Sequence, residues 1–358
     1  MIANSYRANL GAGIDGLTRD ERDVPQPGPT EVLVDVRACS LSFRELMILR
    51  GWYPLPVKPD VVPVSDGAGV VAAIGDRVRR VSVGDRVTAS IFPRWIDGGF
   101  DLDRADQLGG SLDGMLTEYA LLDEDAIVGI PDHLSFEEAA CLPCAGVTAW
   151  NALTGGRGLV AGETVLTLGS GGVSLFALQF AKASGARVIA TTSSAEKAQR
   201  LRSLGADEVI DYRATPAWHE QVRALTDGRG ADHVVDVVGA LEQSLQAVAR
   251  NGEIAFVGLL AGDAAPVDPR LLWGSGALVR TIAVGSRAQF EAMNRAIEMN
   301  GLRPVIDRVF GFDEAVDAYR YYERARPLGK VVIARKEQAW HATAAHAGSA
   351  TSAAAPAA

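Results

Sequence analysis

The distribution of apolar and polar residues divides the chain into two parts. From about Thr164 to Gly285, short runs rich in β-branched residues alternate with longer stretches that have apolar residues at helical spacing. The strand-like runs include TVLTLG, ARVIATT and HVVDVV, and the helix-like stretches include VSLFALQFAKASG, AEKAQRLRSLG and LEQSLQAVARNG. Apolar strands that alternate with amphipathic helices indicate a parallel sheet covered on both faces. The pattern predicts a doubly wound α/β domain of the kind that binds dinucleotides.

Residues 1 to about 140 carry shorter strand-like runs that Gly, Pro and Asp interrupt. Examples are EVLVDVRACSLS, GAGVVAAIG, VGDRVTAS and MLTEYALL, and the one convincing helix is FRELMILRG. This pattern predicts a compact β-rich domain. After Gly285 two helices and two strands follow, ending in GKVVIA, and we expect this segment to return to the first domain. The expected domains are residues 1–140, completed by 286–335, and residues 141–285, with an active site between them.

Composition excludes several classes of partner. The 358 residues carry a net charge of −9 without a basic run, so a nucleic-acid partner is not expected. No apolar stretch reaches the roughly eighteen residues that span a bilayer, and the N-terminus has no signal pattern, so we expect a cytoplasmic protein. Three cysteines do not make a disulfide scaffold. Residues 336–358 are rich in Ala, Ser and Thr, which predicts a disordered low-complexity tail.

The segment TLGSGGVSLFALQFAK predicts a strand that ends in a glycine turn and continues directly into a helix. Such a turn binds a pyrophosphate through backbone amides and the positive end of the helix dipole. Ser174 stands where the third glycine of this motif is usual, and it is small enough for the helix to pack on the strand. The predicted pyrophosphate loop consists of Gly169, Ser170, Gly171, Gly172 and Val173.

The residues after the next strand bear on which dinucleotide binds. NAD-selective domains usually place an acidic residue there for the ribose diol. This chain has Thr192, Ser193 and Ser194 instead, with Lys197 on the first turn of the following helix. Hydroxyls and a lysine can hold the 2′-phosphate that a carboxylate would repel. The sequence therefore favours NADP(H) over NAD(H).

Several motifs in register resemble the medium-chain dehydrogenase/reductases. They are VGDRV, LPCAGVTAW, AGETVLTLGSGGVS, VIATTSSAEKAQRLRSLGADEVIDYR and LGKVVI, spread from about residue 28 to 334. The resemblance implies a GroES-like catalytic domain, a Rossmann domain, and a homodimer or homotetramer. Within the superfamily the chain is most similar to the zinc-free alcohol dehydrogenase-like and quinone oxidoreductase-like branches.

The zinc-free placement depends on the residues at the positions of the zinc ligands. Where zinc members have a cysteine followed by a histidine, this chain has Ser42 and Phe43. Where they have Gly-His-Glu, it has Ser65 and Asp66 after a valine, and no histidine precedes His133. A zinc site needs thiolate and imidazole ligands that these residues do not supply. The remaining pair, Cys141 and Cys144, is half of a zinc site, and we interpret it as small buried residues of a packed turn.

The resemblance also suggests the residues around the reaction centre. Ser42 could hydrogen-bond the substrate or the nicotinamide ribose, although it could instead cap the helix FRELMILRG in a capping box with Glu45. The candidate catalytic residues are Ser42, Tyr53, Asp66 and Thr148. Thr148 matches a threonine beside the nicotinamide, and Tyr212 matches a tyrosine that packs on the 2′-phosphate. Strand ends that could contact the cofactor supply Gly239, Val257, Gly258, Leu259, Val284 and Ser286.

These observations predict an NADPH-dependent, zinc-independent oxidoreductase. Without a Lewis acid, conjugation in a quinone or enone lets the oxyanion form away from the carbon that accepts hydride. We therefore expect reduction of a quinone, an enone or a related activated carbonyl compound. Two alternatives stay open: a zinc-independent alcohol or aldehyde dehydrogenase-reductase, and an NADPH-binding protein with little turnover.

Overall fold

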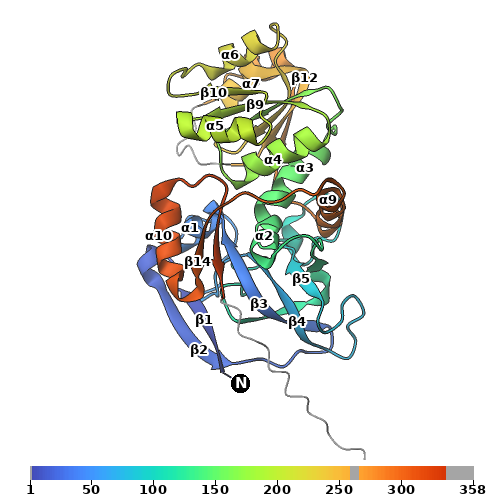
Figure 1. Cartoon of the computed structure of the whole chain (residues 1–358), viewed down its shortest axis with the longest axis vertical. Coiled ribbons are helices and arrows are strands. Elements are labelled where there is room, and N and C mark those ends of the chain that lie inside the picture. The colour runs from blue at the N-terminus through green and yellow to red at the C-terminus, as the bar shows by residue number, and fades with distance from the viewer. Residues whose placement is uncertain (1, 259–265, 336–358) are drawn as a thin grey trace, which may run out of the picture.

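A computed structural model describes residues 2–258 and 266–335, which form two bodies stacked along the long axis of the molecule (Figure 1). One body contains a parallel sheet with helices on both faces, and the other contains a mixed, mostly antiparallel sheet. The predicted combination of a doubly wound domain with a β-rich domain is confirmed. The exact domain boundaries at residues 140 and 285 stay predictions. The predicted tail, residues 336–358, lies outside the described residues.

The parallel sheet has the order β10-β9-β8-β11-β12-β13. Its strands are β8 (Thr164–Thr167), β9 (Arg187–Thr192), β10 (Glu208–Asp211), β11 (Ala231–Asp236), β12 (Val248–Phe256) and β13 (Leu278–Thr281). The chain order reverses between β8 and β11, and the carboxyl ends of strands at such a reversal form the usual dinucleotide site. The glycine turn follows β8 directly, so the fold puts it at this position.

Alternate residues of each parallel strand face opposite cores. Leu166, Ile189 and Ile254 pack in one core, while their neighbours Val165 and Val188 pack in the other. The associated helices are α3 (Val147–Thr154), α4 (Gly172–Ala183), α5 (Ala195–Ser203), α6 (Trp218–Leu225), α7 (Leu241–Ala247) and α8 (Pro269–Ser275). The predicted helix LEQSLQAVARNG is too long, because its second half is the beginning of β12. That segment pairs with β11, and sheet pairing outweighs the local helical pattern.

The mixed sheet has the order β14-β15-β3-β4-β5-β7, with β6 paired to β3. Its strands are β3 (Glu31–Leu41), β4 (Asp66–Ile74), β5 (Arg86–Ala89), β6 (Tyr119–Asp123), β7 (Ile127–Gly129), β14 (Ile306–Gly311) and β15 (Lys330–Ala334). The helices of this body are α1 (Phe43–Leu49), α2 (Phe136–Ala139), α9 (Arg287–Asn300) and α10 (Ala315–Ala325). Short helical turns are η1 (Gly13–Gly16), η2 (Leu102–Arg104), η3 (Glu124–Ala126), η4 (Leu142–Gly146) and η5 (Phe312–Glu314). After Gly285 the chain reaches this sheet again, since β15 pairs antiparallel with β3.

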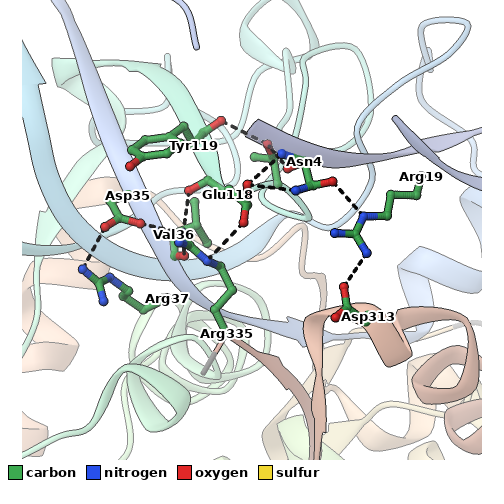
Figure 2. A network of polar contacts seen from close by, with 10 residues as sticks. Asn4, Arg19, Asp35, Val36, Arg37, Glu118, Tyr119, Asp313 and Arg335 are labelled. Atoms are coloured by element: carbon green, nitrogen blue, oxygen red, sulfur yellow. Dashed lines mark hydrogen bonds and ion pairs between the residues drawn. The ribbon is translucent and has the colours of Figure 1, made fainter. Parts of the chain in front are cut away.

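An antiparallel hairpin of β1 (Ile2–Ala8) and β2 (Leu17–Asp23), which the sequence pattern did not predict, packs beside this sheet. Figure 2 shows the polar contacts that join it to the end of the described chain. The Glu118 carboxylate accepts from the Asn4 amide and lies 3.8 Å from Arg335 Nε. Arg335 also donates to the Asp35 carboxylate at 2.6 Å. These contacts fix the end of β15, and with it the position of Lys330 at the other end of that strand.

Candidate functional site

The centre of the candidate site is a buried cluster of Ser42, Asp66 and Lys330. Ser42 follows the last residue of β3, Asp66 begins β4, and Lys330 begins β15, which pairs with β3 so that Val331 lies opposite Leu41. The Lys330 ammonium donates to Ser42 Oγ at 2.8 Å and to Asp66 Oδ2 at 3.3 Å. The sheet thus brings together side chains that are 264 and 288 positions apart in the sequence.

The capping box expected for Ser42 is wrong. Ser42 precedes α1, but its side chain makes no capping hydrogen bond, and its hydroxyl faces Lys330. The Glu45 carboxylate does not reach back to Ser42; it accepts from Val64 N at 3.2 Å and from Ser65 N at 3.4 Å. The Ser42 hydroxyl and the Glu45 carboxylate, which a capping box would have used, therefore accept hydrogen bonds from residues outside α1.

The charge states of the cluster follow from its burial. Burial lowers the pKa of Lys330, but the neighbouring Asp66 carboxylate, together with Cys141, Cys144 and Tyr322, outweighs burial and holds that pKa above its ordinary value. Lys330 is therefore an ammonium group at neutral pH. Ser65 Oγ donates to Asp66 Oδ1 at 2.9 Å, which satisfies the second carboxylate oxygen.

Cys144 and Cys141 lie on or beside the π-helical turn η4, next to this cluster. Burial raises the pKa of each thiol to about 12, so both are protonated at neutral pH. Cys141 is fully buried and donates to the Glu137 carbonyl, as expected for a packed turn. Cys144 is half-buried and packs on a group of aromatic and aliphatic side chains that includes Phe92 and Trp95. These side chains give the neighbourhood of the cluster an apolar character.

Among residues 2–258 and 266–335, no group of three or more His, Cys, Asp and Glu side chains could hold a metal ion. At the positions of the family's zinc ligands, two hydroxyls, of Ser42 and Ser65, replace a thiolate and an imidazole. A zinc ion there would also lie beside the ammonium of Lys330, which repels a cation. The residues present do not fit a catalytic zinc.

The glycine turn fits a pyrophosphate. Gly169 has φ +80°, which a side chain would strain, and a Cβ added at Gly169 or Gly171 would meet no atom within 4 Å. The turn therefore leaves free space in front of the N-terminus of α4. Ser174 is buried and its hydroxyl donates to the Leu168 carbonyl at 2.7 Å, so it packs the helix onto the strand as predicted. Gly329 N donates to Ser170 O at 3.0 Å and joins the loop to the segment that begins β15.

The residues expected at the 2′-phosphate have different environments. Thr192 is buried at the end of β9, and the Ser194 hydroxyl caps α5 by accepting from Lys197 N at 3.2 Å. Ser193 is half-buried, and Tyr212 is exposed at the end of β10. The exposed Lys197 ammonium donates to the Arg326 carbonyl at 2.5 Å. The surface at the end of β9 therefore combines the half-buried Ser193 and Ser194 with Lys197 and Tyr212, and the Lys197 ammonium is held by a backbone carbonyl.

The remaining predicted cofactor contacts lie near the carboxyl ends of later strands or in α3. Gly239 has φ +90°, and its amide donates to Asp236 Oδ1 at 2.8 Å. Gly258 packs so closely on Val237 that a Cβ would lie 1.8 Å from the Val237 carbonyl oxygen. Val257 is half-buried beside it, Thr148 is buried in the first turn of α3, and Leu259 lies outside the described residues.

Two of the predicted contacts at the end of β13 have local structural roles. The hydroxyl of Ser286 accepts from Gln289 N and forms the capping box of α9, so any cofactor contact of this residue would use its backbone, and that contact stays a prediction. Val284 has φ +87°, a rare conformation for a β-branched residue. Asn151 Nδ2 donates to its carbonyl at 2.7 Å and holds that conformation.

Three charged residues of the site were not predicted from the sequence. Lys330 belongs to the motif LGKVVI, which only marked the family. Arg44 and Glu45 are buried although they lie on the first turn of a helix. The two adjacent opposite charges in the otherwise apolar run FRELMIL could have indicated a buried ion pair, since charged residues are rarely buried unless they are paired.

The fold and the site define a two-domain dehydrogenase/reductase. Residues 28–132 match the family described as alcohol dehydrogenase GroES-like domain, and residues 172–299 match the family described as zinc-binding dehydrogenase. The chain belongs to the medium-chain dehydrogenase/reductase superfamily and is an oxidoreductase of that family.

Similar curated relatives cover almost the whole chain. It is 42% identical over 332 residues to the zinc-type alcohol dehydrogenase-like protein C1773.06c of Schizosaccharomyces pombe, covering 90% of this chain and 96% of that protein. It is 35% identical over 324 residues to a quinone oxidoreductase of Pseudomonas aeruginosa, covering 86% and 92%.

Solved structures give the same picture. A proposed alcohol dehydrogenase from Sinorhizobium meliloti 1021 has a TM-score of 0.87 and 40% identity, covering 93% of this chain and 98% of that one. Among the other neighbours, one is an NAD-dependent alcohol dehydrogenase (TM-score 0.84, 33% identity, covering 93% of this chain and 100% of that one). Another is a 2-octenoyl-CoA carboxylase reductase in complex with NADP (TM-score 0.83, 26% identity, covering 96% and 90%). Similar folds therefore use either dinucleotide. No helix in the described part of the chain is long and apolar enough to cross a membrane.

Proposed function

We propose that this protein is a zinc-independent, NADPH-dependent oxidoreductase that transfers hydride to a quinone, an enone or a related activated carbonyl compound. The observation that carries the proposal is the cluster of Ser42, Asp66 and Lys330. It puts a hydroxyl and an ammonium where zinc members of the family hold a metal. The site is therefore equipped to donate hydrogen bonds and not to act as a Lewis acid.

NADPH is the favoured cofactor because of the residues at the end of β9. Bound there, it would supply the hydride for the reaction. Gly169 to Val173 would face the pyrophosphate, and Ser193, Lys197 and Tyr212 would face the 2′-phosphate. No acidic residue stands between Arg187 and Ala195 to favour the 2′-hydroxyl of NAD.

The substrate preference follows from what the side chains can stabilise. A hydroxyl near an ammonium can hydrogen-bond a developing oxyanion, but it polarises an isolated ketone less strongly than a zinc ion does. A conjugated carbonyl spreads the developing charge and needs less polarisation. The apolar side chains around Cys144, among them Phe92 and Trp95, suit the ring or alkene of such a compound.

The relatives described as alcohol dehydrogenases favour a second candidate function, reduction of aldehydes or oxidation of alcohols at the same residues. The two functions differ in substrate and share the cofactor and the side chains. An NADPH-binding role with little turnover is the remaining alternative.

A stopped-flow panel tests the proposal. The purified protein is mixed with NADPH or NADH and with quinones, enones, aldehydes and ketones, and oxidation of the cofactor is followed by absorbance. We expect the fastest oxidation with NADPH and a quinone or enone. Faster turnover of aldehydes would favour the second candidate. Tight NADPH binding without turnover of any compound would favour the binding role, and a preference for NADH would refute the cofactor assignment.

A further inference from the structure

The first turn of helix α1 contains two adjacent charged residues that are both buried. Arg44 is 8% exposed and Glu45 is 1% exposed. Arg44 Nη1 donates to Glu45 Oε1 at 3.0 Å, and Nη2 donates to the Leu108 carbonyl at 2.8 Å and to Gln107 Oε1 at 3.1 Å. A buried ion pair stabilises a fold no better than apolar residues of the same size. Its presence beside a candidate site therefore points to a role in that site.

The guanidinium of Arg44 lies against Tyr53, one of the candidate catalytic residues. Its central carbon is 4.9 Å from the centroid of the Tyr53 ring. Arg44 Nε is buried and makes no hydrogen bond with any residue that the structure describes. A planar cation in contact with a phenol fixes the ring and attracts the negative charge that forms when the hydroxyl releases its proton.

The same ion pair connects Tyr53 to the cluster around Lys330. The Glu45 carboxylate accepts from the backbone amide of Ser65, and the Ser65 hydroxyl donates to Asp66, the partner of Lys330. Cys144, which lies next to the cluster, and Leu55, two residues after Tyr53, pack on the same group of side chains around Phe92 and Trp95. Tyr53 and the cluster of Ser42, Asp66 and Lys330 therefore border one site.

We propose that Arg44 is a positioning residue for Tyr53: the buried guanidinium holds the phenol and strengthens it as the proton donor to the substrate oxygen. This inference rests on the proposed function. Hydride adds to the β-carbon of an enone, and the electrons of the carbon–carbon double bond shift so that the carbonyl oxygen becomes an enolate oxygen. The Tyr53 O–H bond then breaks, its proton passes to that oxygen, and water returns a proton to the phenolate. Arg44 offsets the phenolate charge during the step.

Electrostatics at Tyr53 agree with this role. Burial raises the pKa of Tyr53, and the charge of Arg44 opposes that rise. Without Arg44, the phenol would be a weaker acid in the same apolar surroundings. Lysine at this position would keep a charge but could neither stack on the ring nor bridge Glu45 and Gln107 in one plane.

A double-mutant cycle tests the inference. The variants are Arg44→Lys, Tyr53→Phe and the double variant, each measured with saturating NADPH and with 2-cyclohexen-1-one and 1,4-benzoquinone as probes. We expect Tyr53→Phe to lower kcat about 100-fold, the usual size of a lost general acid, with the KM for NADPH unchanged. Arg44→Lys should lower kcat about tenfold alone and should have no further effect when Tyr53 is already Phe. In the unmodified protein, kcat should fall at alkaline pH as Tyr53 loses its proton, and this fall should be absent in Tyr53→Phe.

Arg308 and Tyr321 provide a matched control, because Arg308 lies 5.1 Å from the Tyr321 ring centroid on the surface formed by β14 and α10. Arg308→Lys and Tyr321→Phe should leave kcat unchanged. Equal kcat in Tyr53→Phe and the unmodified protein would overturn the inference, as would an Arg44→Lys effect that persists at full size in the Tyr53→Phe background. If Arg44→Lys does not fold, the inference is tested by Tyr53→Phe alone. An unchanged kcat in that variant, or an unchanged fall of kcat at alkaline pH, would then overturn it. No turnover of any probe by the unmodified protein would instead refute the proposed function.

Discussion

The buried pair of Lys330 and Asp66 offers a direct test of what holds the candidate site together. The substitution Lys330→Met keeps a long side chain and removes the ammonium. Asp66 is fully buried, and after the change it retains only the hydrogen bond from Ser65 Oγ among the side-chain donors described. The variant therefore leaves one uncompensated charge in the interior of the mixed sheet.

The expected loss of stability is large. Removing one partner of a buried ion pair costs about 3–5 kcal/mol, and 1 kcal/mol shifts the Tm of a domain of this size by about 2–4 °C. Scanning calorimetry should therefore show a Tm lower by about 10 °C for the transition of this domain. The exposed pair of Lys182 and Asp207, with side chains 33% and 39% exposed, is the control. Lys182→Met should lower Tm by less than about 4 °C, because exposed pairs contribute at most about 1 kcal/mol.

The pH dependence adds a second test. Burial raises the pKa of the Asp66 carboxyl, and the loss of Lys330 should raise it further. A raised carboxyl pKa destabilises the fold above the unfolded-state pKa of about 3.9, and the penalty fades as pH falls and the carboxyl takes up a proton. The Tm gap between Lys330→Met and the unmodified protein should therefore shrink from neutral to acidic pH. The double variant Lys330→Met/Asp66→Asn should recover most of the loss. Equal losses in Lys330→Met and Lys182→Met, or no recovery in the double variant, would refute the reasoning.

Three further predictions follow from the described surfaces. Lys197→Ala should weaken NADPH binding about tenfold and leave NADH binding unchanged, measured by titration calorimetry; equal losses for both would remove the 2′-phosphate assignment. Elemental analysis should find less than about 0.1 zinc per chain, and chelation should not change turnover; stoichiometric zinc lost together with activity would contradict the zinc-independent mechanism. We expect a homodimer or homotetramer, and the proposed contact consists of the edge strand β13, where Leu278 is 47% exposed, and of α8, where Trp273 is 87% exposed. Trp273→Glu should then give monomers in analytical ultracentrifugation, whereas a monomeric parent protein would exclude the contact.

The sequence was most informative where function depends on the backbone. Gly169 and Gly171 leave space in front of a helix N-terminus, and glycines at these two positions of the sequence are enough to predict that space. The packing role of Ser174 was predictable for the same reason, since a small residue was needed there. The apolar strands between amphipathic helices determined the doubly wound sheet in the same local way.

Side-chain partners were less predictable. Ser42 and Glu45 have the spacing of a capping box, yet Lys330 donates to the Ser42 hydroxyl, and the backbone amides of Val64 and Ser65 donate to the Glu45 carboxylate. Ser194 and Ser286, whose contacts with the cofactor stay predictions, also cap helices through their side chains. A local motif indicates which hydrogen bonds a side chain could make. Tertiary packing determines which donor or acceptor lies close enough to make one.

The sequence by itself determined the two kinds of sheet, the glycine turn before α4, and the serines at positions 42 and 65. Only the tertiary structure decided which charged group lies beside Ser42, because Lys330 reaches it through the pairing of β15 with β3. Likewise, the burial of Arg44 against Tyr53 depends on Gln107 and Leu108, which belong to a distant loop. Hydrophobic periodicity is a property of neighbouring residues and can be read locally. A buried charge is compensated by whichever groups folding brings to it, and their distance along the chain hides them from the sequence.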